Sequence, residues 1–281
     1  LAVPDGLDPV RRIALEHSHP EWMVAMWLEQ FGERETERMC AANNVPPRVS
    51  VRVNTLKRSR DELLERMRLD GLDARPSPIA PAGIIVAGGG NMAHTPWYKE
   101  GELSIQDESS MLVAEAVDPQ PGERVLDCCA APGGKTGHMA EKMGDIGEIV
   151  SCDVHEHKRR LIEAQIERLG LKCVTTIVED ARRLPARFDE GTFDRILLDA
   201  PCSGLGVIRR KPDVKWAKRP EDIGRIAALQ SELLHAVARL LKPGGILVYS
   251  TCTVTRQENE DVVNRFLREH SDFAPADFPE T

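Results

Sequence analysis

The sequence predicts an α/β protein with a doubly wound, mostly parallel sheet, preceded by a smaller N-terminal α/β subdomain. From residue 109 onward, strand-like and helix-like segments alternate along the chain. Two of these strands, Arg195–Asp199 and Gly245–Thr251, have apolar interiors, as expected when helices cover both faces of a parallel sheet. Ligands of such sheets bind outside the carboxyl ends of the strands. The residues at those ends are therefore the candidate site.

The composition supports a folded protein and excludes several other classes. Of the 281 residues, 41% are apolar and 29% are charged, which excludes a disordered or collagen-like chain. The apolar runs are shorter than the ~18 residues of a membrane span, and the polar first twenty residues show no secretory signal. The seven cysteines include no C-x-x-C pair, so we expect no disulfide scaffold, no bound metal and a cytoplasmic location.

Two segments precede the parallel sheet. Residues 8–43 carry a broad apolar stripe typical of helix, and we interpret residues 1–45 as a helical N-terminal segment that ends before Pro46-Pro47. Residues 46–108 are predicted to form a small α/β subdomain of the RRM-like type. Its elements are a strand at Val49–Asn54, a helix capped by Ser59 and Glu62 that ends at Asp70-Gly71, and strands near Asp73–Arg75, Ile84–Ala87 and Glu102–Ile105.

Residues 109–281 form the predicted catalytic domain. Its strands are expected at Arg124–Asp127, Glu148–Asp153, Val174–Val178, Arg195–Asp199 and Gly245–Thr251. Its helices are expected at Thr136–Met143, Glu156–Leu169, Asp222–Leu241 and Glu258–His270. In this winding the last two strands should be neighbours, about 4.8 Å apart.

The charge distribution favours a polyanionic partner although the net charge is −8. Residues 48–60 and 209–219 each carry a net charge of +5. Two concentrated basic strips on an acidic body are typical of proteins that hold a nucleic acid in one place. The alternative is that both strips are merely solvated faces, and charge alone does not decide between the two readings.

The first strand runs into the glycine-containing loop Asp127–Thr136, which a helix follows. Gly133 and Gly134 let the backbone approach a ligand, and the helix start offers N–H groups. Gly134-Lys135-Thr136 resembles the end of a phosphate-binding P-loop, but Cys129 occupies the position of its first glycine. We therefore expect a nucleoside cofactor rather than a triphosphate. A P-loop ATPase and a plain tight turn remain as alternatives.

Acids follow the successive strands of the predicted sheet. Asp153 closes the second strand, 26 residues after Asp127, where an acid that binds ribose hydroxyls is expected. Asp180 follows the third strand and could accept a hydrogen bond from an adenine amino group, and Asp199 closes the fourth. Any one of these acids alone would more often cap a helix. Together they predict a nucleoside site in one crevice.

Two cysteines provide the most specific catalytic signal. Cys202 follows the fourth strand in Pro201-Cys202-Ser203, and Cys252 follows the fifth strand in Thr251-Cys252-Thr253. A single cysteine at a strand end is usually a small buried hydrophobic residue. Two thiols at the same sheet edge, beside an acid and a nucleoside-type loop, favour nucleophilic catalysis. The residues themselves do not show which thiol attacks.

Three of these segments resemble the Sun-type RNA cytosine-5 methyltransferases, and among them the bacterial group that acts on 16S ribosomal RNA. They are Asp127–Thr136, Arg195–Arg210 and Leu241–Thr253. The similarity extends over roughly residues 17–270 and includes His19–Trp22 and Arg52–Lys57. It implies a Rossmann-like class I methyltransferase fold.

The resemblance also implies the cofactor and the roles of the site residues. S-adenosylmethionine would be bound by the loop residues Cys129, Ala130, Ala131, Pro132, Gly133, Gly134 and Lys135, and by Asp153, Asp180 and Asp199. Cys252 would attack C6 of the cytosine, because C5 is a poor nucleophile until a thiolate has added at C6. Cys202 would assist release of the product, and Asp199 would stabilise the adduct at N3. The target base must also be unstacked.

The implied partner is RNA, with small-subunit ribosomal RNA preferred over transfer RNA and no membrane involved. Candidate contacts are Arg52, Lys57, Arg209, Arg210 and Lys211, and we expect a monomer. Members of the group also carry an N-terminal NusB-like domain and a C-terminal β-hairpin, so we expect the chain to be part of a longer protein. A non-catalytic RNA-binding assembly factor on the same fold is the competing interpretation, although both cysteines and all the acids are present.

Overall fold

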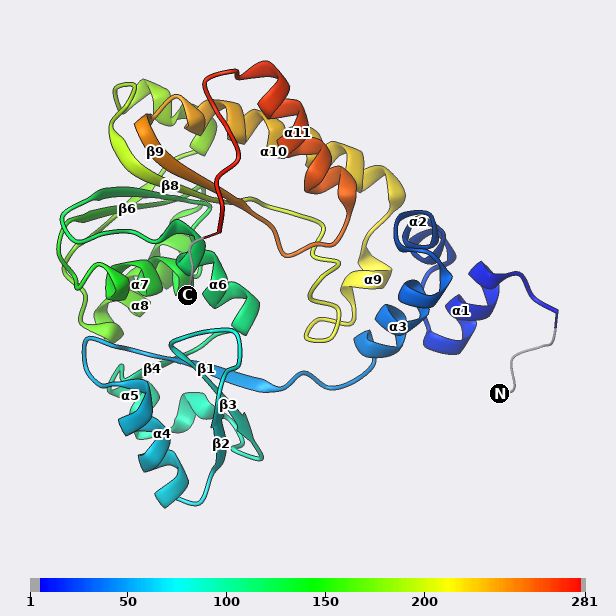
Figure 1. Ribbon diagram of the computed structural model, residues 1–281, viewed down its shortest axis with the longest axis horizontal. Helices are drawn as coiled ribbons and strands as arrows, with labels where there is room; N and C mark the ends of the chain where they lie inside the picture. Colours follow the sequence, from blue (N-terminus) through cyan, green and yellow to red (C-terminus); the bar gives the residue numbers. More distant parts are fainter. Residues whose placement is uncertain (1–5, 279–281) are drawn as a thin grey trace. The chain divides into compact units, whose positions relative to one another are not determined.

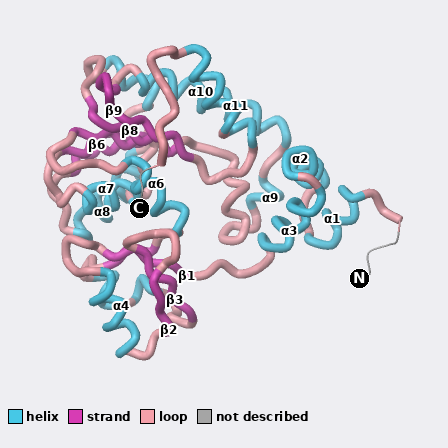
Figure 2. The backbone as a smooth tube through the Cα atoms, in the orientation of Figure 1, coloured by secondary structure: helices cyan, strands magenta, loops and turns pink. Residues whose placement is uncertain are grey.

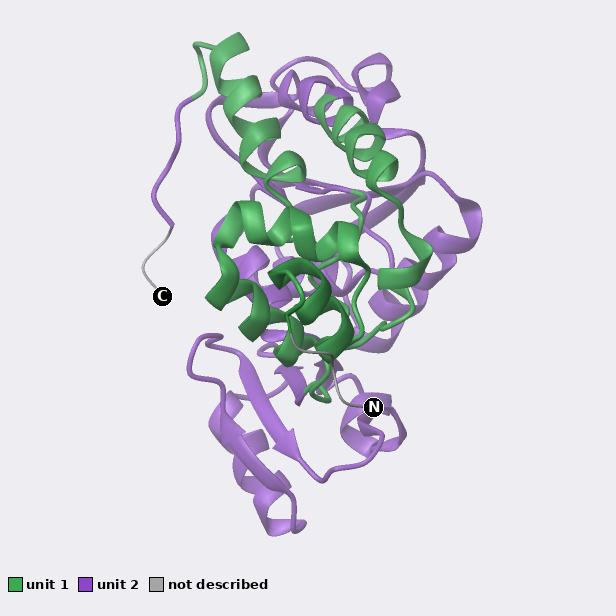
Figure 3. Cartoon of the chain, turned by 90° about the vertical axis from the view of Figure 1, so that its right-hand side faces the viewer, with its two compact units in different colours: residues 1–47, 201–231, 251–273 green, residues 48–200, 232–250, 274–281 purple. Residues whose placement is uncertain are grey.

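The computed structural model describes residues 6–278, which form two compact units (Figure 3). Unit 1 combines residues 1–47, 201–231 and 251–273, and unit 2 combines residues 48–200, 232–250 and 274–281. The first five residues of the predicted helical segment and the last three of the predicted catalytic domain lie outside the described residues. Among residues 6–278, no helix has both the length and the apolarity needed to span a membrane.

Unit 1 is built mainly from helices. The predicted helical stretch forms three helices, α1 (Pro9–His17), α2 (Glu21–Phe31) and α3 (Glu33–Asn43), drawn in blue in Figure 1. The breaks fall at Ser18 and Gly32, which both have positive φ values, so the helix cannot continue through them. Two further helices are α9 (Val214–Ala217) and α11 (Glu260–Glu269), and the unit includes the first part of α10 (Pro220–Ala238).

The core of unit 1 explains why sequence-distant segments belong together. Trp27, fully buried on α2, packs in one hydrophobic cluster with Ile13 of α1 and Cys40 of α3. The same cluster contains Leu205 and Ile208 from the segment that follows the fourth strand of the large sheet. The N-terminal helices therefore share their core with residues that the sequence assigns to the catalytic domain.

Unit 2 contains two sheets, shown in magenta in Figure 2. The smaller sheet is antiparallel, in the order β2-β3-β1-β4. Its strands are β1 (Val49–Val53), β2 (Asp73–Pro76), β3 (Gly83–Ala87) and β4 (Leu103–Ile105), with helices α4 (Arg60–Leu69) and α5 (Pro96–Lys99). Ser59 and Glu62 form the predicted capping box at the start of α4, which is thus confirmed.

The larger sheet has five parallel strands in the order β7-β6-β5-β8-β9. Its elements are α6 (Glu108–Val117), β5 (Arg124–Cys128), α7 (Gly134–Lys142), β6 (Glu148–Asp153), α8 (Glu156–Leu169), β7 (Val174–Val178), β8 (Phe193–Asp199) and β9 (Leu241–Ser250). The predicted doubly wound fold and the pairing of the last two strands are confirmed. However, α10 ends at Ala238 rather than at Leu241, because Leu241 already pairs with Phe193 in the sheet.

Arg52 joins the strand β1 of the small sheet to the helix α7, which corrects its interpretation as an RNA contact. Its side chain is fully buried, and its Nε and Nη2 atoms each donate to a carboxylate oxygen of Glu141 on α7 at 2.9 Å. Its Nη1 atom donates to the carbonyl oxygen of Gly134 at 2.8 Å and also to Gln106. The sequence shows a basic strip, but β1 turns this arginine toward the protein interior, where RNA cannot reach it.

Candidate active site

The predicted cofactor loop connects β5 to α7 in a tight backbone path. Cys129 has a positive φ of 58°, and its neighbour Ala130 donates its backbone N–H to the carbonyl of Cys152 on β6 at 3.0 Å. Gly133 has a φ of 98°, and a Cβ atom there would lie 3.1 Å from the Cα atom of Ile162 on α8. This position therefore requires glycine, and the loop closes directly onto the N-terminus of α7, where backbone N–H groups suit an anionic ligand group.

Asp153 lies beside this loop and is 3% exposed. Its Oδ2 atom accepts from the backbone N–H of Ala131 at 3.1 Å, and its Oδ1 atom accepts from Val154 N at 2.8 Å. A carboxylate has about four lone-pair sites, so this arrangement leaves acceptor capacity for ligand hydroxyl groups. Asp153 thus lies against the loop at the end of β6, and its role in binding ribose stays a prediction.

Asp199 and Asp180 have different surroundings. Asp199, at the end of β8, accepts from Lys135 Nζ of α7 at 2.6 Å and from Ser250 Oγ of β9 at 2.8 Å. Asp180 follows β7 and accepts from both the backbone and the guanidinium of Arg182, which lowers the pKa of its carboxyl group. Asp180 is therefore a helix cap in this structure, whereas Asp199 connects the strands β8 and β9 with the helix α7.

Asp127 is a fully buried carboxyl group beneath the loop. Its Oδ2 atom accepts from Thr136 Oγ1 at 2.5 Å, and its Oδ1 atom has no hydrogen-bond partner within the part of the chain that the structure describes. Burial raises its pKa from 3.8 to about 7, and the carboxylates of Asp199 and Asp153 add to the rise. The folded protein therefore keeps Asp127 neutral over a pH range in which the unfolded chain ionises it.

We expect Asp127→Asn to change the pH dependence of stability. The neutral carboxyl contributes stability that is fully present below about pH 4 and is lost as pH rises toward about pH 7. Relative to Asp127→Asn, the free energy of unfolding of the native chain should fall by about 1.4 kcal/mol per pH unit across that window. Urea unfolding of both proteins at several pH values measures this difference. Parallel curves would mean that Asp127 titrates alike in the folded and unfolded chains.

The two candidate catalytic thiols meet in unit 1. The Sγ atoms of Cys202 and Cys252 lie 3.1 Å apart, and the backbone N–H of Cys252 points to the sulfur of Cys202 at 3.3 Å. Cys202 is half-buried and Cys252 is exposed. The hydrogen bond with Cys252, together with burial, raises the pKa of Cys202. Either sulfur can donate to the other at this distance, and Cys252 is the better solvated of the two.

A close backbone approach holds the two cysteine segments together. Gly206 donates its N–H to the carbonyl oxygen of Cys252 at 3.0 Å, and a Cβ atom at Gly206 would lie 2.8 Å from that oxygen.

The other five cysteines differ from this pair. Burial raises the pKa of every one of them, which keeps the thiols protonated: Cys40, Cys128, Cys129, Cys152 and Cys173.

Sequence reasoning missed one acidic residue beside the thiols. Glu258 is fully buried and accepts from the backbone and the hydroxyl of Ser203, the residue after Cys202. In the sequence it stands in the polar run Gln257–Glu260, which is typical of an exposed helix start. The only available signal was its position six residues after Cys252.

The remaining predicted RNA contacts lie on the surface. Arg209, Arg210 and Lys211 are exposed in unit 1, and Arg209 also donates to the carbonyl oxygen of Val45 at 3.1 Å. Lys57 is exposed in unit 2, where its Nζ atom donates to the carbonyl of Glu100. These residues lie at the surface, in contrast to Arg52, and their contact with RNA stays a prediction.

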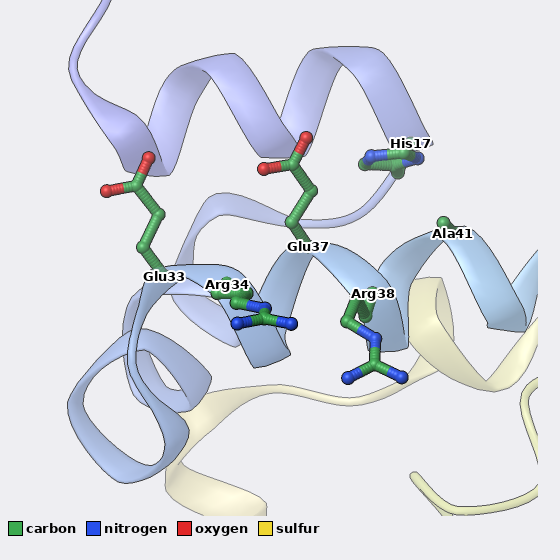
Figure 4. Close-up of a pocket in the computed structure, with 6 residues that line it drawn as sticks. All are labelled: His17, Glu33, Arg34, Glu37, Arg38 and Ala41. Carbon is green, nitrogen blue, oxygen red and sulfur yellow. The ribbon is translucent and has the colours of Figure 1, made fainter.

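A pocket of about 580 Å³ lies between α1 and α3 (Figure 4). Ligand atoms of Glu16, His17 and Glu37 lie within 4.8 Å of one another there, as in some metal sites. However, the guanidinium of Arg12 donates to both Glu16 and Glu37 at 2.9–3.2 Å. Arg12 supplies the positive charge that a metal ion would bring, so we assign no metal to this cluster.

The fold and the loop define the class of protein. Five parallel strands with a glycine-containing loop after β5 and acids at the following strand ends form a Rossmann-like class I methyltransferase domain. A family model described as 16S rRNA methyltransferase RsmB/F matches residues 114–280, and one for the ferredoxin-like domain of RsmF/B-like methyltransferases matches residues 19–93. The chain therefore belongs to the RsmB/F methyltransferase family.

Individual relatives agree with this assignment. The chain is 48% identical over 268 residues to the probable ribosomal RNA small subunit methyltransferase B of Bacillus subtilis, which covers 95% of this chain and 60% of that protein. A methyltransferase homologue from Pyrococcus horikoshii superposes with a TM-score of 0.83 at 35% identity, covering 93% of this chain and 83% of the other. NSun6 from the same organism, crystallised with SFG, gives 0.81 at 25% identity, covering 89% and 87%. The chain spans about 60% of the length of the curated relatives.

Proposed function

We propose that this chain transfers a methyl group from S-adenosylmethionine to C5 of a cytosine in small-subunit ribosomal RNA, through a covalent bond between Cys252 and C6. The pair of thiols 3.1 Å apart carries this proposal. Two thiols in contact at the ends of adjacent strands suit a reaction that needs both a nucleophile and a proton carrier. The names of the relatives, which specify ribosomal RNA of the small subunit, support the substrate class.

The cofactor residues fit S-adenosylmethionine by their donor and acceptor chemistry. The N-terminus of α7 suits the carboxylate of the amino-acid part, and Asp153 has acceptor capacity for the ribose hydroxyls. Lys135, Asp180 and Asp199 are the other charged side chains of the predicted cofactor-binding set. When bound, the cofactor supplies an electrophilic methyl group. The distance between the Cα atoms of Asp199 and Cys202 is at most about 11 Å, because only Ala200 and Pro201 separate them in the chain.

The two thiols divide the chemistry between them. Cys252, as the thiolate, adds to C6 of the cytosine, and the electron pair of the C5–C6 double bond makes C5 nucleophilic toward the methyl group. The hydrogen bond to Cys252 raises the pKa of Cys202, and that cause disappears once the Cys252 sulfur is bonded to carbon. Cys202 can then give its proton to water more easily. Its thiolate accepts the C5 proton, the electrons of the C5–H bond re-form the C5–C6 double bond, and the Cys252 thiolate leaves from C6.

Methyl transfer from radiolabelled S-adenosylmethionine to unmethylated small-subunit ribosomal RNA tests the function directly. Bisulfite sequencing should then find one protected cytosine, and transfer RNA should accept far less label. Calorimetry should show binding of S-adenosylmethionine and none of ATP. ATP binding without methyl transfer would favour the ATPase reading, and RNA binding without methyl transfer would favour an assembly factor.

Asp153→Ala should weaken S-adenosylmethionine binding by about 1.5–3 kcal/mol, the range for losing a charged hydrogen-bond acceptor. Calorimetry measures the change, and Glu156→Ala, an exposed acid three residues later, is the matched control. Because Asp153 also holds Ala131, Asp153→Asn should be compared, since its carbonyl oxygen can keep that bond. Unchanged affinity in Asp153→Ala would place the ribose contact elsewhere.

Replacing Arg209, Arg210 and Lys211 together by glutamine should lower RNA affinity and flatten its salt dependence. Each lost phosphate contact should reduce the slope of log K against log salt by about 0.7–0.9. Filter binding across a salt series measures this slope. The control is a triple variant with the same charge change on exposed arginines of the same unit: Arg11, Arg34 and Arg38. Equal slopes in the two triple variants would make residues 209–211 a solvated face.

A further inference from the structure

A buried carboxylate connects the two segments that carry the thiols. Glu258, at the end of the short helix η3 (Arg256–Glu258), has an exposed fraction of 0%. Its Oε1 atom accepts from the backbone N–H of Ser203 at 2.7 Å, and its Oε2 atom accepts from Ser203 Oγ at 2.6 Å. Its Oε2 atom also accepts from Thr255 Oγ1 at 2.6 Å. One side chain thus binds the residue after Cys202 and a residue of the Cys252 segment.

The neighbouring polar groups extend this connection. Ser203 Oγ lies 2.7 Å from Thr253 Oγ1, and Thr253 directly follows Cys252. Fully buried Gln230 of α10 donates through Nε2 to the carbonyl of Pro201 at 2.9 Å and to Glu258 at 3.3 Å. Residues on both sides of Cys202 and the residue after Cys252 are therefore restrained by one hydrogen-bonded network centred on Glu258.

We propose that Glu258 is a positioning residue that holds the Cys202 and Cys252 thiols in contact. Burying a carboxylate costs several kcal/mol unless hydrogen bonds compensate. Here the shortest hydrogen bonds to the carboxylate come from Ser203 and Thr255, one on each thiol-bearing segment. Separating the two segments would leave the buried acid without donors, so this cost keeps them together. A carboxylate can accept all of these bonds, whereas an amide would present N–H groups to the same donors. The inference deepens the proposed function, on which its catalytic consequence rests.

The test compares Glu258→Gln with Glu260→Gln, an exposed acid two residues later that serves as the matched control. The first readout needs no catalysis. Diamide, an azo compound, oxidises two neighbouring thiols to a disulfide and takes up both thiol hydrogens on its N=N bond. Peptide mapping measures the rate at which the Cys202–Cys252 disulfide forms. The second readout is the rate of covalent trapping on RNA that contains 5-fluorocytosine at the target, and the third is S-adenosylmethionine affinity by calorimetry.

We expect both rates to fall about tenfold or more in Glu258→Gln, the effect of losing charged hydrogen bonds, while cofactor affinity stays within about twofold. Glu260→Gln should match the native chain in all three measurements. Should Glu258→Gln fail to fold, Thr255→Val removes one donor and should lower both rates about threefold. Disulfide and trapping rates equal to those of the control would overturn the proposal. If the disulfide forms more slowly in Glu258→Gln but even the native chain is not trapped on RNA, the positioning role is upheld and the covalent mechanism is rejected.

Discussion

Cys252→Ala is expected to abolish both methyl transfer and the covalent protein–RNA species. Without a thiolate at C6, C5 of cytosine has no route to becoming nucleophilic, so the loss should be about 10³-fold or more, as for other covalent nucleophiles. Transfer of label measures turnover, and denaturing gel electrophoresis detects the adduct. Cys173→Ala, which removes a buried thiol far from the pair in sequence, should remain active and is the control.

Cys202→Ala should give the complementary result. The Cys252 thiolate can still add to C6 and the methyl group can still be transferred, but elimination should stall because the group that accepts the C5 proton is missing. The protein should therefore accumulate as an RNA adduct that survives denaturation. An adduct with Cys252→Ala and none with Cys202→Ala would exchange the two roles. Two inactive variants without adduct would show that attack requires both thiols.

The large sheet was predictable because its strands carry their own signals. β6, β7 and the helix α8 occupy the predicted residues. β6 has an apolar stretch bounded by charged residues, and the edge strand β7 consists of β-branched residues, which favour strands. The helix α6 (Glu108–Val117) was missed although Asp107 stands at its N-cap, because it lies where the predicted subdomain ends and the catalytic domain begins. The proximity of Cys202 and Cys252 followed from topology alone, because adjacent parallel strands end at the same edge.

Side-chain burial was less predictable than topology. Arg52 belongs to the basic strip of residues 48–60 and Glu258 to the polar run Gln257–Glu260, and for charged side chains the prior expectation is solvent exposure. Each is buried because its partner comes from far away in the sequence: Glu141 for Arg52 and Ser203 for Glu258. A single sequence does not reveal such pairs, since the charge pattern is the same whether the side chain points outward or inward. The buried Lys215 within the second basic strip is a further case.

Arg52→Ala should destabilise the protein by about 3–5 kcal/mol, the cost of leaving a buried charge without its partner. The variant leaves the Glu141 carboxylate, which is 1% exposed, facing an empty space. It also removes the donor to the Gly134 carbonyl, at the start of α7 where the cofactor loop ends. Urea unfolding measures the loss, and Arg124→Ala is the matched control. Its pair with Glu148 is 39% and 41% exposed, so it should cost about 1 kcal/mol or less.

A double variant separates the charge from the packing. Replacing both Arg52 and Glu141 by methionine removes the two buried charges together, so it should recover most of the stability lost in Arg52→Ala. RNA binding provides an independent check of the corrected role, because the salt dependence of Arg52→Met/Glu141→Met should equal that of the native chain. A reduced salt slope would return Arg52 to the RNA contacts. A loss below about 1 kcal/mol in Arg52→Ala would mean that water reaches the pair.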